Sequence, residues 1–333
     1  MTLPSSWPLG APEPPRVPLA RGDTPFQPLK RTTQQLGHEV WVKRDDLTGS
    51  ALSGNKVRKL EYLVAEAESR GAPRLVTCGG VNSNHARATA VAAAQRGLRS
   101  HLLLRGEDRV PPVGNLLLDR WVGAEITFVD ADGYAERNDR MAALAGSGGY
   151  VIPEGGSNGL GALGMARCAL ELVEDARTAG VEIGRVVHAC GSGGSTAGLA
   201  LGFAAAGVET DVVAVNVMKD AAFFTAEVER ILADVAARGH ASEDVLSRAR
   251  FRIQDGFVGE GYARTTSDEM AELQGFAQTE GLVVDPVYTG KALLALLRNG
   301  LGPPPSRGVT VFVHTGGIFE LFAYAAEIAA LRS

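Results

Sequence analysis

The chain has 333 residues, of which 45% are hydrophobic and 21% are charged, and its formal net charge is −5. This balance is typical of a globular protein with a substantial core, and the length favours about two domains. The acidic balance and the lack of a Lys/Arg-rich stripe argue against a nucleic-acid partner. No apolar run of about 18 residues occurs, so the sequence predicts no membrane span.

The first segment of the chain is rich in proline, with six prolines between Pro4 and Pro18. It lacks the basic start and apolar stretch of a secretory signal peptide. We expect the residues before Pro28 to form an arm that wraps around the fold. The sequence contains three widely spaced cysteines, Cys78, Cys168 and Cys190. They fit neither a metal site nor a disulfide framework, so we expect no metal and a cytoplasmic, reducing location.

Short apolar, β-rich runs alternate with helical segments along most of the chain. The predicted strands are residues 74–78, 101–104, 125–129, 185–190, 212–217 and 308–314. Helices are predicted over about residues 83–95, near 113–122, and after the Gly-rich loops at 191–196 and 315–317. The alternation predicts an α/β fold with two open, twisted, mostly parallel sheets flanked by helices, in blocks near residues 60–160 and 170–330. Ligands then lie beyond the carboxyl ends of the strands, in a cleft between the blocks.

Lys56 follows Ser53-Gly54-Asn55 and begins a segment whose apolar residues recur at helical spacing. This places Lys56 in the first turn of a helix, where the macrodipole disfavours an ammonium group and lowers its pKa. A lysine that forms a Schiff base needs such a shift, because only the neutral amine attacks an aldehyde. A solvated surface lysine is the alternative interpretation, and the motifs that follow decide between the two.

Residues 191–196 (GSGGST) follow a predicted strand and open a helix. Backbone N–H groups, hydroxyls and the helix N-terminus together predict an anion site. The loop departs from a dinucleotide fingerprint, because Thr196 replaces the third glycine and Asp211 precedes the next strand instead of ending it. No P-loop motif occurs, so a single phosphate monoester is the favoured ligand. A tight turn without a ligand is the alternative.

Six motifs in the same order resemble the fold-type II pyridoxal 5′-phosphate (PLP) enzymes of the D-cysteine desulfhydrase and 1-aminocyclopropane-1-carboxylate (ACC) deaminase group. They are KRDDLTG (43–49), GNKVRKLEYL (54–63), GGVNSNHAR (79–87), GSGGSTAGL (191–199), DPVYTGKA (285–292) and HTGG (314–317). The resemblance implies a tryptophan synthase β-like fold. Residues 1–58 and 169–333 would form a larger PLP-binding domain and residues 59–168 a smaller α/β domain, with the active site between them. It also implies a homodimer.

The resemblance assigns a role to individual residues of the cofactor site. Lys56 would form the Schiff base with PLP and move the Cα proton of the substrate. The PLP phosphate would be held by Gly191, Gly193, Gly194, Ser195 and Thr196. Asn84 would hydrogen-bond the pyridoxal 3′-oxygen, Tyr288 would lie against the ring, and Thr315 would contact the cofactor.

A second group of residues would bind the amino-acid substrate. Ser83, Asn84 and His85 begin a predicted helix after a Gly loop, which suits a substrate α-carboxylate, and Tyr262 would reach the substrate. We expect Ser83, Tyr262 and Tyr288 to share the catalytic work with Lys56, since phenols shuttle protons when a neighbour lowers their pKa. Taken without the resemblance, residues 82–84 also fit a helix N-cap and Tyr262 a core aromatic.

Three positions distinguish the two reactions of the group. ACC deaminases carry glutamate, leucine and glutamine where this chain has Thr289, Thr315 and His85. A carboxylate beside the pyridine nitrogen makes a strong electron sink, which cyclopropane opening needs, whereas hydroxyls give a weaker sink that suffices for β-elimination. We therefore expect D-cysteine to be converted to pyruvate, hydrogen sulfide and ammonia. ACC deamination, sulfo-lyase action on L-cysteate, and a non-catalytic metabolite-binding protein are the alternatives.

One motif departs from the group. After HTGG the group usually continues with Ala-Pro, whereas this chain has residues 318–320 (IFE). We interpret Glu320 as a carboxylate at a helix start, favoured by the dipole. The alternative is that this loop touches the substrate and changes the side chain that is accepted.

Overall fold

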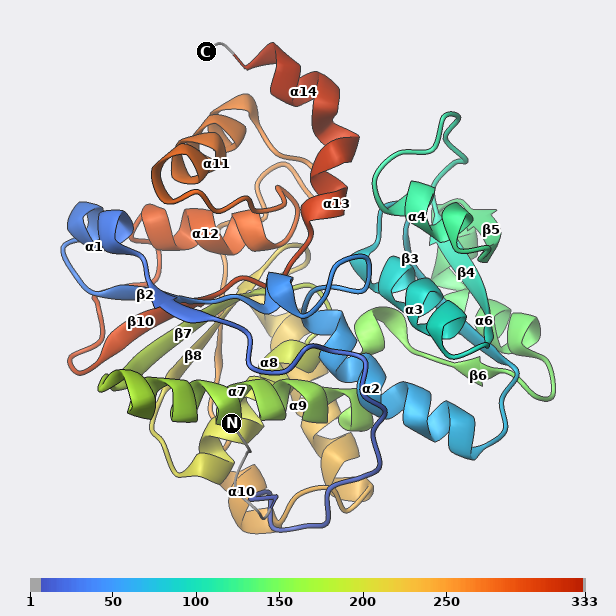
Figure 1. The fold of residues 1–333 in the computed structure, drawn as a ribbon, viewed down its shortest axis with the longest axis horizontal. Helices are drawn as coiled ribbons and strands as arrows, with labels where there is room; N and C mark the ends of the chain where they lie inside the picture. Colours follow the sequence, from blue (N-terminus) through green and yellow to red (C-terminus); the bar gives the residue numbers. More distant parts are fainter. Residues whose placement is uncertain (1–6, 332–333) are drawn as a thin grey trace.

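A computed structural model describes residues 7–331 as two α/β lobes, each built on its own sheet (Figure 1). Within these residues the larger sheet has six strands in the order β1-β2-β10-β7-β8-β9, and every neighbouring pair is parallel except β1 with β2. Its strands are β1 (Phe26–Pro28), β2 (Val40–Lys43), β7 (Ile183–Cys190), β8 (Asp211–Asn216), β9 (Arg252–Gln254) and β10 (Val309–Val313).

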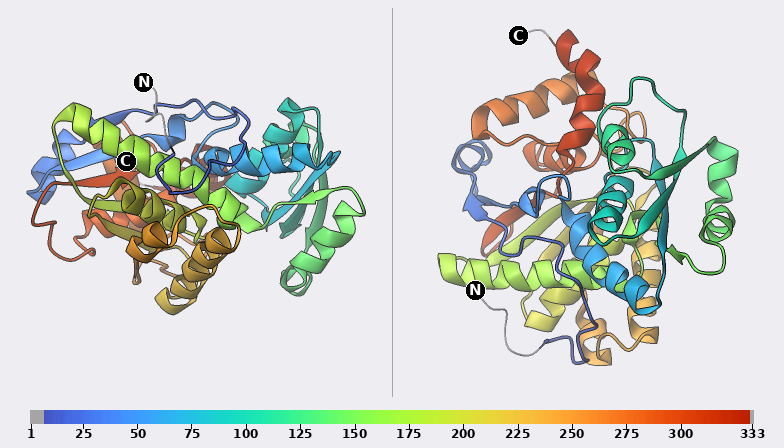
Figure 2. Two further views of the ribbon diagram at one scale, coloured as in Figure 1. Left: turned by 90° about the horizontal axis from the view of Figure 1, so that it is seen from below. Right: turned by 45° about the vertical axis from the view of Figure 1, so that its right-hand side comes forward.

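The smaller sheet has, among the described residues, four parallel strands in the order β5-β4-β3-β6. They are β3 (Arg74–Gly80), β4 (Arg99–Arg105), β5 (Glu125–Val129) and β6 (Tyr150–Val151). Figure 2 shows from two further directions that this sheet and its helices form a lobe beside the larger sheet. The two predicted open sheets, mostly parallel and flanked by helices, are confirmed.

The helices that surround the larger sheet are α1 (Lys30–Leu36), α7 (Gly159–Ala179), α8 (Gly194–Ala206), α9 (Ala221–Ala237), α10 (Glu243–Arg248), α11 (Ser267–Glu280) and α12 (Thr289–Leu297). Those of the smaller lobe and the connections are α2 (Asn55–Ser69), α3 (Asn84–Gln95), α4 (Asn115–Trp121), α5 (Ala131–Ala135) and α6 (Arg137–Ala145). The chain continues after β10 with α13 (Ile318–Leu321) and α14 (Ala325–Ala330), and single 3₁₀ turns are η1 (Asp45–Leu47), η2 (Glu154–Gly156) and η3 (Phe322–Tyr324).

The central strands of the larger sheet are buried on both faces because helices cover both. On one face α12 contacts β7 and β8, and on the other α8 contacts the same strands (Figure 1). Strand side chains such as Val187, Val213 and Val311 are accordingly inaccessible to solvent. This is why β8 and β10 are rich in valine and show no alternation of apolar and polar residues, the pattern from which parallel strands were predicted.

Helices α7 and α8 pack unusually close together beneath the larger sheet. A Cβ atom on Gly198 would lie 2.1 Å from the carbonyl oxygen of Ala162, and one on Gly202 would lie 2.4 Å from that of Ala166. The small residues of α8 are therefore required for this contact. The contact holds the N-terminus of α8, and with it the 191–196 loop, in a fixed place.

The proline-rich segment forms the arm that the sequence predicts, over its described part. Leu9 is fully buried and Val17 nearly so. The arm runs along α2, where the backbone N–H groups of Leu19 and Ala20 donate to Glu61 Oε1 at 2.9 and 3.0 Å. Figure 1 shows the arm beside α2 and α7. Pro4 lies outside the described residues.

The domain limits at 58/59 and 168/169 stay a prediction at the level of single residues. Helices α2 and α7 each run across one of these limits. Among residues 7–331, no helix is both long and apolar enough to span a membrane.

Candidate active site

A cavity lies where the carboxyl ends of β3, β7 and β10 meet the start of α2. Eight of the predicted site residues line it: Lys56, Ser83, Asn84, His85, Gly191, Tyr262, Tyr288 and Thr315. The other four, Gly193, Gly194, Ser195 and Thr196, do not line the cavity and follow Gly191 and Ser192 into the first turn of α8. The loops thus converge at the strand ends, as the sheet topology requires.

Lys56 is the second residue of α2, as predicted. The helix is preceded by Gly54, which has φ +92°. Gly54 lies so close to the loop at residues 314–317 that a Cβ would be 2.8 Å from the Thr315 carbonyl oxygen. Lys56 Nζ donates to Asn55 Oδ1 at 3.1 Å. The pKa of Lys56 is lowered to about 8, chiefly by burial and also by Arg87, while Cys190 and Asp285 act to raise it. The predicted direction is confirmed, but burial is the main cause.

The loop at residues 191–196 combines a left-handed glycine with a helix start. Gly193 has φ +78° and α8 begins at the next residue, so N–H groups of its first turn lack helical acceptors. Asn55 Nδ2 donates to Ser195 Oγ at 2.9 Å. The Thr196 hydroxyl instead turns inward, 3.3 Å from His188 Nε2. Thr196 therefore offers its backbone N–H, and not its side chain, to an anion.

Lys59 is a residue of this site that the sequence analysis missed. It is fully buried one turn after Lys56, and its Nζ donates to the Gly155 carbonyl oxygen at 3.1 Å and to Ser157 Oγ at 3.2 Å. The N–H of Gly194 donates to the same Ser157 oxygen at 3.2 Å. The second amine thus stands next to the anion loop. Its spacing of three from Lys56 is the signal that places both on one helix face.

Ser83 caps α3, as the alternative interpretation of residues 82–84 predicted. Its hydroxyl accepts a hydrogen bond from the N–H of Ala86 at 3.2 Å while the residue also lines the cavity. A cap and a ligand contact are therefore compatible at this position.

The His85 ring is not available to donate a hydrogen bond to an anion in the cavity. Its Nε2 lies 2.9 Å from Thr77 Oγ1, and the Thr77 hydroxyl donates its one proton to the Ile152 carbonyl oxygen at 2.9 Å. Nε2 must then carry the proton, which leaves Nδ1 a buried acceptor without a partner among the described residues. Burial, with Lys56 and Lys59 nearby, holds the pKa of His85 well below its usual value. Only its backbone N–H suits a carboxylate.

Tyr262 and Tyr288 form a pair on the cavity wall. Their hydroxyls contact each other, and their rings meet edge to face with centroids 5.8 Å apart. Burial raises the pKa of both phenols, helped by Glu320 at Tyr262 and by Tyr262 at Tyr288. This direction is opposite to the lowering that favours proton abstraction. Raised pKa values keep both phenols protonated and neutral.

The wall at Thr289 and Thr315 is made of hydroxyls. The Thr289 hydroxyl donates to the Gly316 carbonyl oxygen at 2.9 Å and lies 3.0 Å from Thr315 Oγ1. Thr315 lines the cavity, and Thr289 lies behind it. Asp285 also borders the cavity, but its carboxylate accepts backbone N–H groups of residues 287–289 at 2.6 to 3.0 Å. Its carboxylate therefore holds the backbone that leads into α12.

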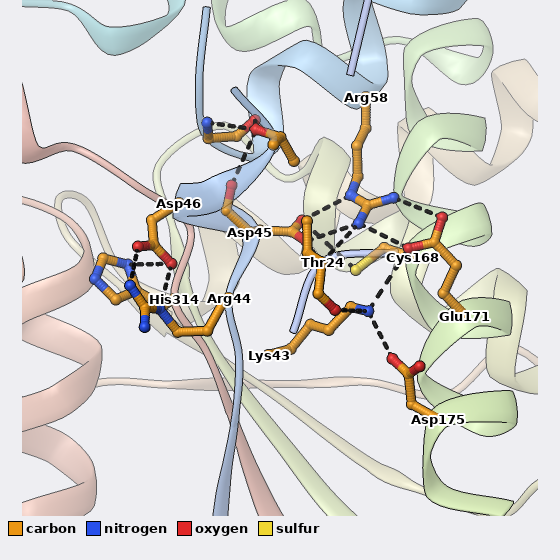
Figure 3. A network of polar contacts seen from close by, with 12 residues as sticks. Thr24, Lys43, Arg44, Asp45, Asp46, Arg58, Cys168, Glu171, Asp175 and His314 are labelled. Carbon is orange, nitrogen blue, oxygen red and sulfur yellow. Dashed lines mark hydrogen bonds and ion pairs between the residues drawn. The ribbon is translucent and has the colours of Figure 1, made fainter. Parts of the chain in front are cut away.

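Residues 43–46 (KRDD) do not line the cavity; two of them take part in a network of buried ion pairs beside it. Arg58 lies between Asp45 and Glu171, 2.8 Å from each carboxylate, and Lys43 Nζ lies 2.6 Å from Asp175 (Figure 3). All of these groups are buried or nearly buried except Asp175. Buried ions need such pairing, so the motif fixes α2 and its lysine against α7.

The donor set fits PLP. An amine of lowered pKa faces the cavity, and an anion loop with a second buried amine stands beside it. A Cβ on Gly194 would lie 2.6 Å from Ser157 Oγ and 2.9 Å from Lys59 Nζ, so the cradle accepts only glycine there. A dinucleotide fits poorly, because Asp211 begins β8 and pairs with Arg185 at 2.8 Å.

Comparisons with known proteins agree with a site for PLP. A family model described as pyridoxal-phosphate dependent enzyme matches residues 17–316. The chain is 38% identical to a D-cysteine desulfhydrase of Serratia proteamaculans, over 94% of this chain and 97% of that protein. It is also 38% identical to a mitochondrial bifunctional D-cysteine desulfhydrase/1-aminocyclopropane-1-carboxylate deaminase of Arabidopsis thaliana, over 94% and 80%. The crystal structure of an ACC deaminase homologue is 33% identical with a TM-score of 0.82, over 96% and 97%.

The chain therefore belongs to the family of pyridoxal-phosphate dependent enzymes. The predicted cofactor, the predicted fold type and the predicted group are confirmed. The roles of the individual residues stay predictions.

Proposed function

We propose that this chain catalyses β-elimination on D-cysteine, in which D-cysteine and water yield pyruvate, hydrogen sulfide and ammonia. The observation that carries the proposal is the position of Lys56, which lines one cavity together with Gly191 of the anion loop and Thr315. The D-cysteine desulfhydrase among the relatives supports the substrate.

PLP would be held by Lys56, by the N–H groups of residues 191–196, and by the amine of Lys59, whose pKa burial and the nearby Lys56 hold well below its usual value. When bound, PLP supplies the electron sink that stabilises negative charge on the substrate Cα. Lys56 accepts the Cα proton, because a pKa near 8 leaves an appreciable neutral fraction at physiological pH. The backbone N–H groups at the start of α3 orient the substrate carboxylate. The paired phenols of Tyr262 and Tyr288 hold a proton beside the leaving sulfur.

Elimination is favoured over ACC ring opening by the Thr289–Thr315 wall. The Thr289 hydroxyl is committed to the Gly316 carbonyl oxygen. Thr315 must then donate its own proton to Thr289 Oγ1, so the pair brings no negative charge to the place where a carboxylate would keep the pyridine protonated. The weaker electron sink that results is adequate when Cα carries a proton and Cβ carries a good leaving group.

The test is a comparison of substrates with the PLP-loaded protein. D-cysteine, L-cysteine, L-cysteate and ACC are supplied separately, and pyruvate, sulfide, sulfite and α-ketobutyrate are measured. We expect pyruvate and sulfide in equal amounts from D-cysteine. Faster α-ketobutyrate formation from ACC, or sulfite release from L-cysteate with no sulfide from D-cysteine, would contradict the proposal.

A homodimer in the cytoplasm is the proposed assembly and location. Large apolar side chains are exposed at Val110 (84%), Trp121 (83%) and Phe322 (61%), which suits a further buried surface. The three cysteines are buried and unpaired, which suits a reducing compartment. Light scattering of the purified protein tests the assembly.

A further inference from the structure

Glu320 is a buried carboxyl group at the edge of the active site. It lies in the first turn of α13, as predicted, but it is only 3% exposed, and its Oε2 accepts a hydrogen bond from Asn84 Nδ2 at 3.1 Å. Asn84 itself lines the cavity. The interpretation as a simple helix-start carboxylate is therefore incomplete, because the side chain reaches across to α3 in the other lobe.

The other end of the Asn84 amide is fixed as well. Asn84 Oδ1 accepts from Asn115 Nδ2 at 2.9 Å, and the same Nδ2 donates to the Asn82 carbonyl oxygen at 2.7 Å. Asn115 Oδ1 accepts from Arg87 Nε at 3.2 Å. A guanidinium only donates and a carbonyl only accepts, so the orientation of the Asn115 amide is unambiguous. The Asn84 oxygen must then face Asn115 and its nitrogen must face Glu320.

A second contact holds α13 in this place. The Arg87 guanidinium lies over the ring of Phe319, 5.2 Å from its centroid. Gly317 adopts φ +107° just before the helix, and a Cβ there would lie 2.4 Å from Asp285 Oδ2. Phe319 and Glu320 thus contact Arg87 and Asn84, which both hydrogen-bond to Asn115. Residues 319 and 320 are part of the segment that departs from the usual Ala-Pro.

We propose that Glu320 is a positioning residue that fixes the Asn84 amide with its nitrogen toward the active site, so that an N–H remains for an anionic oxygen of the bound cofactor. The proposal rests on the proposed function and on the hydrogen bond from Asn84 to the pyridoxal 3′-oxygen that the family resemblance implies. Without an acceptor at position 320, the amide loses one of the two bonds that distinguish its ends. A rotated amide presents its oxygen to an oxygen, which is repulsive.

The acceptor role does not depend on a charge at Glu320. Burial, together with nearby Asp285, holds the pKa of Glu320 well above its usual value. An uncharged carboxyl group still accepts through its carbonyl oxygen, and a glutamine side chain offers the same acceptor with the same shape. Glu320→Gln is therefore the variant expected to preserve the function, and Glu320→Ala the one expected to lose it.

The experiment compares Glu320→Gln, Glu320→Ala, Asn84→Ala and the double variant Asn84→Ala/Glu320→Ala in the full chain. The control is Glu327→Ala, which removes an exposed carboxylate from α14. Equilibrium dialysis gives the dissociation constant of PLP, absorbance spectra report the bound cofactor, and D-cysteine turnover gives kcat and KM. Thermal unfolding without PLP checks that each variant folds.

Loss of one hydrogen bond to Asn84 predicts PLP binding about five- to tenfold weaker in Glu320→Ala, with Glu320→Gln and Glu327→Ala within about twofold of the unsubstituted protein. In the Asn84→Ala background, Glu320→Ala should change the dissociation constant by less than about twofold, because the partner is gone. Equal losses in the Gln and Ala variants, additive losses in the double variant, or no loss in Glu320→Ala would each overturn the inference. Failure of the unsubstituted protein to bind PLP would instead refute the proposed function.

Discussion

Asn55 and Ser195 are joined by a hydrogen bond of 2.9 Å from Asn55 Nδ2 to Ser195 Oγ, although they are 140 positions apart. Asn55 also accepts from Lys56 Nζ at 3.1 Å. One side chain therefore connects the amine to the anion loop. The position of the amine relative to the anion loop is fixed by these two contacts, and the first prediction depends on them.

Asn55→Ala should weaken PLP binding by about tenfold, since loss of a buried hydrogen bond costs about 1–1.5 kcal/mol. Dissociation constants from equilibrium dialysis measure the change. Gln35→Ala, which removes an exposed amide on α1, is the control and should leave binding unchanged. Equal affinity of the Asn55 variant and the control would show that the bridge does not organise the site.

The rate of covalent PLP addition should rise with pH and level off above pH 9. Burial lowers the pKa of Lys56 to about 8, and the neutral amine, which predominates above that pH, is the reactive form. Stopped-flow absorbance with the cofactor-free protein measures this rate. A rate that continues to rise about tenfold per pH unit beyond pH 9 would indicate an ordinary lysine pKa.

Gly194→Ala should reduce both folding stability and PLP affinity, because the new methyl group would meet Ser157 and Lys59 at 2.6 and 2.9 Å. The matched control is Gly275→Ala in α11, where a Cβ meets nothing within 4 Å. That change should raise the free energy of unfolding by about 0.5–1 kcal/mol, as expected for glycine in a helix interior. Urea unfolding distinguishes the two, and a Gly194 variant as stable as the Gly275 variant would contradict the close approach.

Arg58→Ala should lower the free energy of unfolding by about 3–5 kcal/mol, because it leaves Asp45 buried without its paired cation and leaves Glu171 with Lys43 at 3.7 Å. Although burial works to raise it, the pKa of Asp45 is lowered because Arg58 is adjacent. The stabilisation is therefore present above about pH 4, the pKa of the unfolded state, and is lost as the pH falls below it. Arg177→Ala, which breaks an exposed pair, should have little effect. A small loss for Arg58 would show that the pair is dispensable.

Much of the fold could be predicted because periodicity and glycine position are local properties. The strand at residues 125–129 matches β5, and α3 begins beside the predicted cap Ser83. Strands β1, β2, β6 and β9 were not predicted, since runs of two to four residues carry little periodic signal. Helices α9, α11 and α12 were also not specified, although their apolar spacing was available.

The site was predictable where a motif carries the chemistry, and less so where burial decides it. Lys56 and the 191–196 loop came from local pattern, and the cavity brings them together. The role of Lys59 depends on enclosure by residues 155–157, which are remote in sequence. The direction of the tyrosine pKa shifts depends on burial in the same way. The reach of Glu320 to Asn84 follows from how the two lobes meet, which no local pattern reports.

The most direct test of the account is a peptide map of the PLP-loaded protein after borohydride reduction. We expect a visible absorbance band that reduction removes, and one pyridoxyl phosphate group per chain on the peptide that contains Lys56. Lys56→Ala should fold and carry no such group. A modified lysine elsewhere, or a folded protein that acquires neither the band nor the added mass, would contradict the central claim.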